Sequence, residues 1–454
     1  MPLTRRNALK LAATAAIAPM VWSRSAKAAT EAFGSAKHVL LLNCRGGFRS
    51  HATFNAVGAL QHNPFGSHPA IAGTQWRLGA ACLRDPVSTS LGLVPSLKEV
   101  TGDIAVLGAV DPNKGGTIEI DHVAGQRRVG TGRPDGKNGI LSVVGAHHPL
   151  YAQGFSSAVL PPVEIGPSEL GLGEGQYGAT RPLTLFAGQG GFSATAGIQT
   201  GWHTSLRQRL DERFLAKRSR AYTKRLQAFQ LAKHNASLFL TVLQDPRFDI
   251  LGSPQAGNAG VTNGELIEVL GDHDMRDIGD PQAGRSWGAD IALALRCFSF
   301  GAPIVGVTHD GFDMHDIERD AYGPRAQDLG RQLSGLHFLL KRMPHPDGGT
   351  YFDHTVVLTT SEFSRNNTFA ETGFNSGNGS DHVADGADPA RNMAIAVMGG
   401  PVRAGGRLIG ETDSALKAQG IVFSTADLMA TIFDLLGLDH REHLPGSPIK
   451  ELFV

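Results

Sequence analysis

Unbroken apolar runs, separated by polar and glycine-rich stretches, dominate the pattern of this chain. Five of them have the length of buried strands, at 38–44, 103–110, 302–308, 355–360 and 393–400. They do not alternate with polar residues, as the strands of a sheet with one solvated face would do. Continuous apolar strands are typical of parallel sheets whose two faces are covered by helices. The pattern therefore predicts a parallel sheet that is buried on both faces.

Helical patterns lie between these runs. Residues 284–300 are rich in apolar side chains and lead into the run at 302–308, and in 322–343 leucines recur at steps of three and four on one face. Near the C-terminus, Ser424 followed three residues later by Asp427 predicts the start of another helix. Strands that alternate with helices predict an α/β fold, doubly wound, with a mostly parallel sheet.

The middle segment, 150–283, is less regular. It combines glycine-rich loops with a long charged stretch, and we expect it to form an irregular helical insertion or cap on the sheet. The whole of 29–454 is predicted to be a single α/β domain, because α/β enzymes often form one large domain that exceeds the average domain length.

The first 28 residues have the pattern of an export signal. Arg5 and Arg6 precede an apolar run of about 15 residues, and Ala26 and Ala28 provide a small-residue cleavage site. A membrane span needs about 20 apolar residues, so a retained anchor is the less favoured alternative. We expect the twin-arginine translocon to be a partner during export. The mature protein would be periplasmic or secreted, with no stable membrane anchor.

Composition and missing motifs exclude several classes of function. The 42 lysines and arginines equal the 42 acids, which argues against nucleic acid as a partner, since such a partner favours a basic patch. The three cysteines are widely spaced, so we expect neither a disulfide framework nor a CxxC metal site. The chain has no GxSxG nucleophile elbow and no GxxxxGK[ST] phosphate loop.

Acidic, histidine and arginine side chains gather beside four of the five predicted strands, where ligands of open α/β sheets bind. Carboxylate oxygens and neutral imidazole nitrogens are ligands for zinc, manganese or iron. Each pair alone would also suit a solvated loop, but their convergence favours metal-assisted hydrolysis, in which the ion polarises an oxygen and activates a nucleophile. The pairs are Asp121 and His122, Asp313 and His315, Glu362 and Arg365, and Asp381 and His382.

These motifs resemble those of the secreted bacterial domain-of-unknown-function family 1501 (DUF1501), which is grouped with the alkaline phosphatase and sulfatase superfamily. "TTSEFSRN" resembles the family's "TMSEFGRT", "GSDH" resembles "GTDH", and "FDMH" resembles a run that ends in Trp-Asp-Thr-His. The resemblance implies an alkaline-phosphatase-like sheet, one or two divalent metal ions, and activity on a small anionic substrate, a phosphate or sulfate ester.

The resemblance also implies roles for individual residues. Arg365 would face the anion of the substrate, because its planar fork suits phosphate or sulfate. His122 is a candidate acid/base group. Asp121 stands where the family has a serine, and is a candidate for catalysis, metal binding or helix capping. The predicted metal ligands are Asp313, His315, Glu362, Asp381 and His382.

The chain departs from the family in ways that leave two hypotheses open. Residues 43–60 contain no acid, although the family usually has one there for a second metal, and Arg49 or Ala52 stands in its place. This favours a single ion over two. The leading hypothesis is an exported metal-dependent hydrolase-like protein. The alternative is a non-catalytic periplasmic binding or assembly protein that kept the fold but lost the nucleophile and the second metal site.

Overall fold

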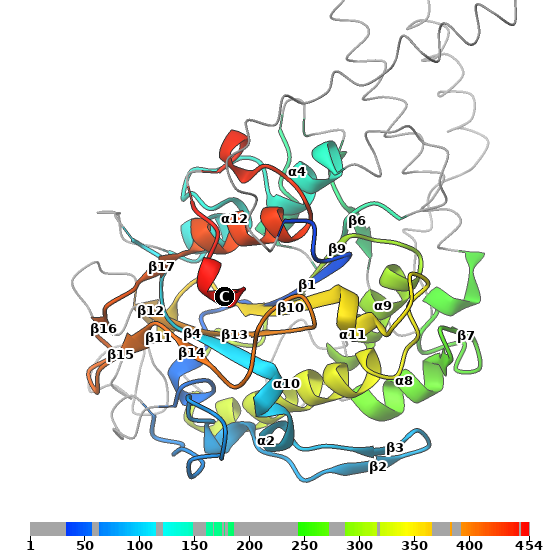
Figure 1. Cartoon of the computed structure of the whole chain (residues 1–454), viewed down its shortest axis with the longest axis horizontal. Coiled ribbons are helices and arrows are strands. Elements are labelled where there is room, and N and C mark those ends of the chain that lie inside the picture. Colours follow the sequence, from blue (N-terminus) through cyan, green and yellow to red (C-terminus); the bar gives the residue numbers. More distant parts are fainter. Residues whose placement is uncertain are drawn as a thin grey trace, which may run out of the picture.

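A computed structural model of the 454-residue chain shows helices packed around one large sheet (Figure 1). The structure describes residues 33–56, 63–114, 121–148, 160–166, 168–174, 177, 180–185, 244–271, 287–315, 318–365, 382–383, 392–444 and 446–453. The predicted export signal, 1–28, lies outside these residues. In the described part of the chain, no helix has the length and apolar character needed to cross a membrane.

Within the described residues, the central sheet has nine strands, in the order β14-β4-β13-β10-β1-β9-β5-β6, with β17 also paired to β4. Neighbouring strands are parallel except at β13, which is antiparallel to β10 and β4. The mostly parallel α/β sheet is therefore confirmed, but the expectation that 393–400 is a parallel strand is wrong. The strands are β1 His38–Cys44, β4 Ile104–Asp111, β5 Val163–Ile165, β6 Leu183–Leu185, β9 Ile304–His309, β10 Thr355–Thr360, β13 Met393–Met398, β14 Leu408–Ile409 and β17 Phe423–Ser424.

Helices cover both faces of the sheet, as the continuous apolar strands require. Leu40 and Leu42 of β1 belong to one buried apolar cluster, and Val39 and Leu41 belong to the other. Helices α8, α9 and α10 pack on the first face, and α12 and α4 lie on the second (Figure 1). The helices are α2 Leu97–Val100, α3 His122–Thr131, α4 Ile140–His147, α8 Asn263–Leu270, α9 Trp287–Ser299, α10 Glu318–Leu340, α11 Tyr351–His354 and α12 Thr425–Leu435.

Short two-stranded sheets and single helical turns accompany the central sheet. Four two-stranded sheets lie outside the central one: β2 Val87–Thr89 with β3 Gly92–Val94, β7 Gly257–Asn258 with β8 Val261–Thr262, β11 Ser364–Arg365 with β12 His382–Val383, and β15 Glu411–Thr412 with β16 Ala418–Gln419. Single turns of 3₁₀ helix occur at Ser50–Ala52, Ala80–Cys82, Thr101–Asp103, Glu169–Gly171, Pro246–Phe248, His440–Glu442 and Lys450–Leu452.

Part of the segment that we expected to be an insertion belongs to the sheet itself. Strands β5 and β6 extend the sheet beyond β9, in parallel, and α8 packs against α9. Each of these two strands has only three residues, which is too short for an apolar run to stand out from the glycine-rich sequence around it. The charged stretch, 204–245, lies outside the described residues except for its last two positions.

A buried histidine at the start of β1 should make the protein sensitive to acid. Burial lowers the pKa of His38 to about 4, against its ordinary 6.5, and its Nδ1 lies 2.8 Å from the carbonyl oxygen of Ala302. The unfolded chain therefore binds the proton more readily, so this contribution to stability is full above pH 6.5 and is lost as the pH falls toward 4.

We expect the wild type to lose about 2 kcal/mol more of its free energy of unfolding than His38→Gln between pH 7.5 and pH 5. A glutamine amide can still donate to Ala302 but does not titrate in this range. Urea unfolding at the two pH values measures the difference, and other titrating groups cancel because both proteins share them. Equal losses in the two proteins would contradict the prediction.

Candidate functional site

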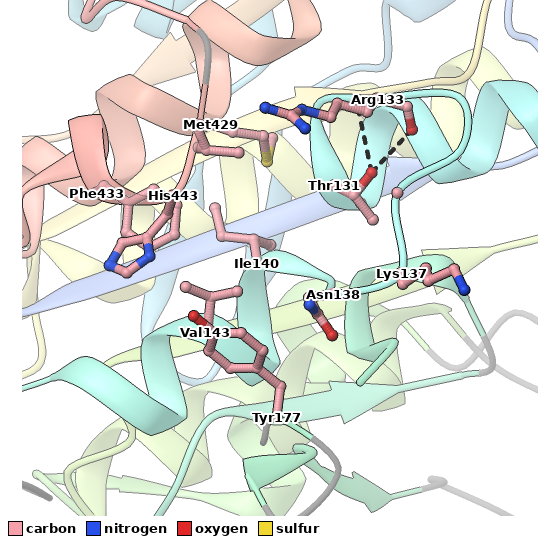
Figure 2. A pocket seen from close by; sticks show the side chains of 13 residues that line it. Thr131, Arg133, Lys137, Asn138, Ile140, Val143, Tyr177, Met429, Phe433 and His443 are labelled. Carbon is pink, nitrogen blue, oxygen red and sulfur yellow. Dashed lines mark hydrogen bonds between the residues drawn. The ribbon is translucent and has the colours of Figure 1, made fainter. Parts of the chain in front are cut away.

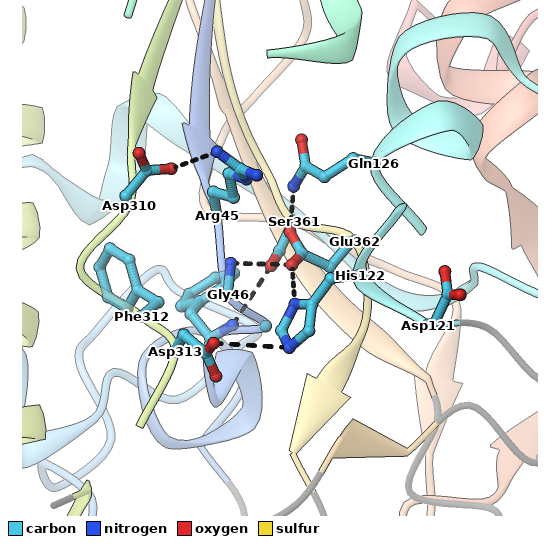
Figure 3. Close-up of polar contacts among 12 residues, drawn as sticks. Arg45, Gly46, Asp121, His122, Gln126, Asp310, Phe312, Asp313, Ser361 and Glu362 are labelled. Atoms are coloured by element: carbon cyan, nitrogen blue, oxygen red, sulfur yellow. Dashed lines mark hydrogen bonds and ion pairs between the residues drawn. The ribbon is translucent and has the colours of Figure 1, made fainter. Parts of the chain in front are cut away.

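The loops that follow β1, β9 and β10 meet at the carboxyl edge of the sheet (Figure 3). Strand β1 lies between β10 and β9 and is parallel to both, and its last residue, Cys44, is in register with His309, the last residue of β9. The three loops therefore leave the sheet side by side, where open α/β sheets bind ligands. Helix α3 adds a fourth segment, because His122 in its first turn contacts Glu362 in the loop after β10.

Two glycines bring the loop after β1 against the other loops. Gly46 and Gly47 have φ angles of 110° and 82°, which L side chains rarely adopt. A Cβ atom on Gly46 would lie 2.0 Å from the backbone nitrogen of Asp313, and one on Gly47 would lie 2.2 Å from the ring of Phe363. Only glycine fits at these positions, and its small size lets the backbone approach the site.

Glu362 is the buried anchor of the site. Its side chain has no exposed surface, and it accepts hydrogen bonds from the backbone N–H of Gly46 at 2.9 Å and from the side-chain amide of Gln126. Its Oε1 also lies 2.7 Å from Nδ1 of His122. The Gln126 carbonyl in turn accepts from the Asn43 amide at 3.0 Å. A buried carboxylate is stable in the fold when it is paired in this way.

Three side chains, one of which contacts Glu362, form a group that could hold a metal ion. Within the described part of the chain, His122, Asp313 and His315 each offer one ligand atom, and these atoms lie within 4.8 Å of one another. Nε2 of His122 is 3.5 Å from Asp313 Oδ2, and Nε2 of His315 is 3.2 Å from Asp313 Oδ1. Bonds of about 2.0–2.1 Å in a tetrahedral zinc site place ligand atoms roughly 3.3 Å apart. The residues present therefore fit a divalent ion.

The charges of the site shift the pKa values of two of these groups. The hydrogen bond to Glu362 and the charges of Glu362 and Asp313 raise the pKa of His122, although burial works against them. Burial tends to raise the pKa of Asp313, but the hydrogen bond and charge of Arg365 outweigh it, so the pKa of Asp313 is lowered. Asp313 is therefore held as a carboxylate, the form that binds metal.

Arg365 does not have the place that we expected for it. Its side chain is fully buried, with Nε donating to the carbonyl of Gly47 at 2.7 Å and a terminal nitrogen donating to the carbonyls of Gly46 and Phe312. The same nitrogen donates to Asp313 Oδ1 at 2.9 Å. Arg365 thus fastens the glycine loop and orients Asp313, instead of presenting its fork to an anion.

The other four predicted residues have different places. Asp121 is the N-cap of α3, where its carboxylate accepts from the backbone N–H of Ala124 at 2.7 Å and its side chain is exposed. The backbone of His382 pairs with Arg365 between β12 and β11, which places this segment beside the site. Asp381 lies outside the described residues. Glu362, expected to be a metal ligand, instead contacts the group of His122, Asp313 and His315 through His122.

Two residues of the site were not singled out from the sequence. Gln126 lies four residues after His122, and that spacing puts both on one face of α3, which is the signal that could have found it. Arg45 follows β1 directly. It is 40% exposed, and its guanidinium lies 3.1 Å from Asp310 in the loop after β9. Figure 3 shows Arg45 beside Asp310 at this edge of the sheet.

The fold and the site define an α/β protein with a histidine–carboxylate group at the carboxyl edge of a mostly parallel sheet. The chain belongs to the family described as "Protein of unknown function (DUF1501)", whose match covers residues 204–447, more than half of the sequence. The match includes Asp313, His315 and Glu362, and begins after His122.

Comparison with curated proteins gives no match. Among solved structures, the chain is similar to the lipoteichoic acid synthase LtaP from Listeria monocytogenes, with 11% sequence identity and a TM-score of 0.36. That alignment covers 93% of this chain and 78% of the synthase chain.

Proposed function

We propose that this protein is an exported, metal-dependent hydrolase that acts on a small phosphate or sulfate ester. The convergence of His122, Asp313 and His315, from two distant segments of the chain, is the observation that supports it most. Three ligands of this kind are typical of catalytic metal sites, which keep a further position open for water or substrate. The resemblance to the alkaline phosphatase and sulfatase superfamily supports the choice of substrate.

The buried carboxylate behind His122 strengthens the case for a metal site. Glu362 accepts a hydrogen bond from Nδ1–H of His122, so in the neutral imidazole the lone pair lies on Nε2, the atom 3.5 Å from Asp313. Metal-ligating histidines usually donate their second ring N–H to a carboxylate or carbonyl in this way. A divalent ion held by the three side chains would supply charge to polarise an ester oxygen. Arg365 would keep Asp313 oriented toward that ion.

The substrate anion needs a different cation from the one that the sequence suggested. Arg365 is buried and engaged with backbone carbonyls, so we assign this role to Arg45, whose guanidinium is partly exposed beside Asp310. An arginine at this edge of the sheet can form two parallel hydrogen bonds with phosphate or sulfate.

We propose export through the twin-arginine translocon, with cleavage after Ala28 and a periplasmic or secreted mature protein. The paired arginines Arg5 and Arg6 and the short apolar run that follows support this. Cell fractionation of the full-length chain tests it. We expect the protein in the periplasm or the medium, and an Arg5→Lys/Arg6→Lys variant retained in the cytoplasm. Export of the variant at the wild-type level would contradict the assignment.

Elemental analysis and hydrolysis assays test the metal-dependent activity. We expect about one equivalent of zinc, manganese or iron in the exported protein, loss of the ion in Asp313→Ala and in His315→Ala, and parallel loss of hydrolysis of 4-nitrophenyl phosphate or sulfate. Circular dichroism shows whether these variants are folded. A folded wild type that is metal-free and inert toward both esters would contradict the proposal.

The non-catalytic alternative has its own support. Asp121, at the position of the family serine, serves as a helix cap. Arg49, which with Ala52 is one of the two candidates for the position of the family acid, is buried against Glu318. Such a protein would be a periplasmic binding or assembly protein that uses the scaffold alone. A wild type that holds the ion but hydrolyses neither ester would favour this alternative.

The Asp121→Ala variant tests whether Asp121 only caps helix α3 or also takes part in catalysis. Loss of an N-cap side chain costs about 1 kcal/mol, so we expect the free energy of unfolding to fall by that amount while the metal content and ester hydrolysis stay close to wild type. Chemical denaturation and metal analysis of the same preparation measure both effects. Complete loss of hydrolysis in a stable Asp121→Ala protein would show instead that this carboxylate takes part in the reaction.

A further inference from the structure

A cavity lies away from the histidine–carboxylate group, on the face of the sheet that α3, α4 and α12 cover (Figure 2). Its volume is about 180 Å³. Ile140 and Val143 of α4 line it from one side, and Met429 and Phe433 of α12 line it from the other. All four side chains are at least 94% buried, so they form an apolar floor.

The size of this cavity suits a single ring. A dry apolar cavity of about 150 Å³ is large enough to bind benzene, and this one is slightly larger. Tyr177 and Leu444 also line the cavity, and the Tyr177 hydroxyl lies 3.2 Å from Nε2 of His147. An aromatic ligand would therefore contact apolar side chains on the sides formed by α4 and α12.

The mouth of the cavity is positively charged. Arg133 and Lys137 stand there with exposed side chains. Among the lining residues, all within the described part of the chain, none is an aspartate or glutamate. Lys137 also lies 3.4 Å from Glu174, but both side chains are more than half exposed, and such surface pairs are weak and easily exchanged. A ligand with negative charge at its outer end would complement this rim.

The polar groups next to the rim reinforce this preference. The Asn138 carbonyl accepts from the backbone N–H of Glu174 at 2.9 Å, which assigns its amide group the role of donor. Helix α4 begins at Ile140, and its N-cap, Gly139, supplies no side-chain cap. The positive end of the helix dipole therefore adds to the charge of the two cations.

We infer that this cavity binds a small aromatic carboxylate, with the ring between α4 and α12 and the carboxylate at the end of the cavity that the cationic residues Arg133 and Lys137 line. The site is separate from the proposed hydrolase centre, and none of its residues belongs to that centre. Its ligand is recognised by a benzene-sized apolar body and one negative charge at the mouth.

Calorimetric titration of the full mature protein with benzoate, and with its neutral analogue benzamide, tests this inference. We expect benzoate to bind at least tenfold more tightly than benzamide. Arg133→Gln/Lys137→Gln should weaken benzoate at least tenfold and leave benzamide unchanged. The matched control is Arg127→Gln, which removes an exposed arginine of α3 that does not line the cavity, and it should bind both compounds like the wild type.

Leu444→Trp should fill the cavity and abolish binding of both compounds, and its thermal unfolding shows whether it is folded. If it does not fold, the Arg133→Gln/Lys137→Gln pair decides the question alone, because these side chains are exposed. The inference is overturned by undetectable binding of benzoate, by equal affinity for benzoate and benzamide, or by full affinity of the charge-removed variant. Metal content is not expected to change in any variant, which separates this test from that of the proposed hydrolase.

Discussion

Replacement of Arg49 by methionine is expected to lower the free energy of unfolding by about 3–5 kcal/mol, because it leaves a charge buried without its partner. Arg49 and Glu318 are 2% and 1% exposed, and their side chains form two hydrogen bonds of 2.9 and 2.8 Å. The phenol of Tyr322 also donates to the backbone carbonyl of Arg49 at 2.6 Å, so the loss would spread to the packing of α10. Urea denaturation measures the change.

A double variant and a matched single variant make this prediction specific. Arg49→Met/Glu318→Leu should recover most of the lost stability, since apolar side chains of similar volume often replace a buried ion pair at little cost. Arg45→Met removes an arginine of the same loop from a partly exposed pair with Asp310, and should cost less than about 1 kcal/mol. Similar losses of free energy of unfolding in Arg45→Met and Arg49→Met would contradict the prediction that breaking the buried pair costs more.

Glu362→Gln is expected to weaken metal binding about 10–100-fold, the usual effect of removing the carboxylate that supports a ligating histidine. Three donors point at Glu362, from Gly46, His122 and Gln126. A glutamine has one acceptor oxygen, so at least one donor would face its amide group. The pKa of His122, now raised by Glu362, should fall. Competition with a chelator measures the affinity, and NMR titration of the imidazole measures the pKa.

Glu265→Gln is a suitable control for this variant. Glu265 closes the capping box of α8, far in sequence from the four segments that form the site, so its replacement should leave metal affinity unchanged. If Glu362→Gln binds metal within twofold of the wild type, Glu362 does not support a metal ligand, and the group of His122, Asp313 and His315 would need another explanation.

The sequence predicted the central strands closely because burial on both faces leaves a continuous apolar run. Strands β1 and β10 have the bounds expected for 38–44 and 355–360, and the capping box of Ser424 and Asp427 begins α12 as predicted. The direction of β13 could not be predicted, because an antiparallel strand buried on both faces has the same apolar pattern as a parallel one. Strands β5 and β6 were too short to be recognised.

The site was predicted in part, and the differences have a common physical origin. The sequence indicated which segments would meet at the sheet edge, since parallel strands end together there. It did not indicate which side chains turn inward after the strands end. Glu362 and Arg365 are both charged and follow the same strand, yet both are fully buried and satisfied by the backbone and by neighbouring side chains. Such burial depends on partners from other loops, which local sequence does not reveal.

The wide spacing of these segments along the chain sets an order of events during synthesis. Gly46 and Glu362 are separated by 316 residues, and His122 and Glu362 by 240, and β1 lies between two strands that are made much later. A nascent chain therefore cannot assemble the site until more than three quarters of it has left the ribosome. Contacts between such distant residues form slowly. An ion that needs both His122 and Asp313 would therefore bind only after the chain has folded.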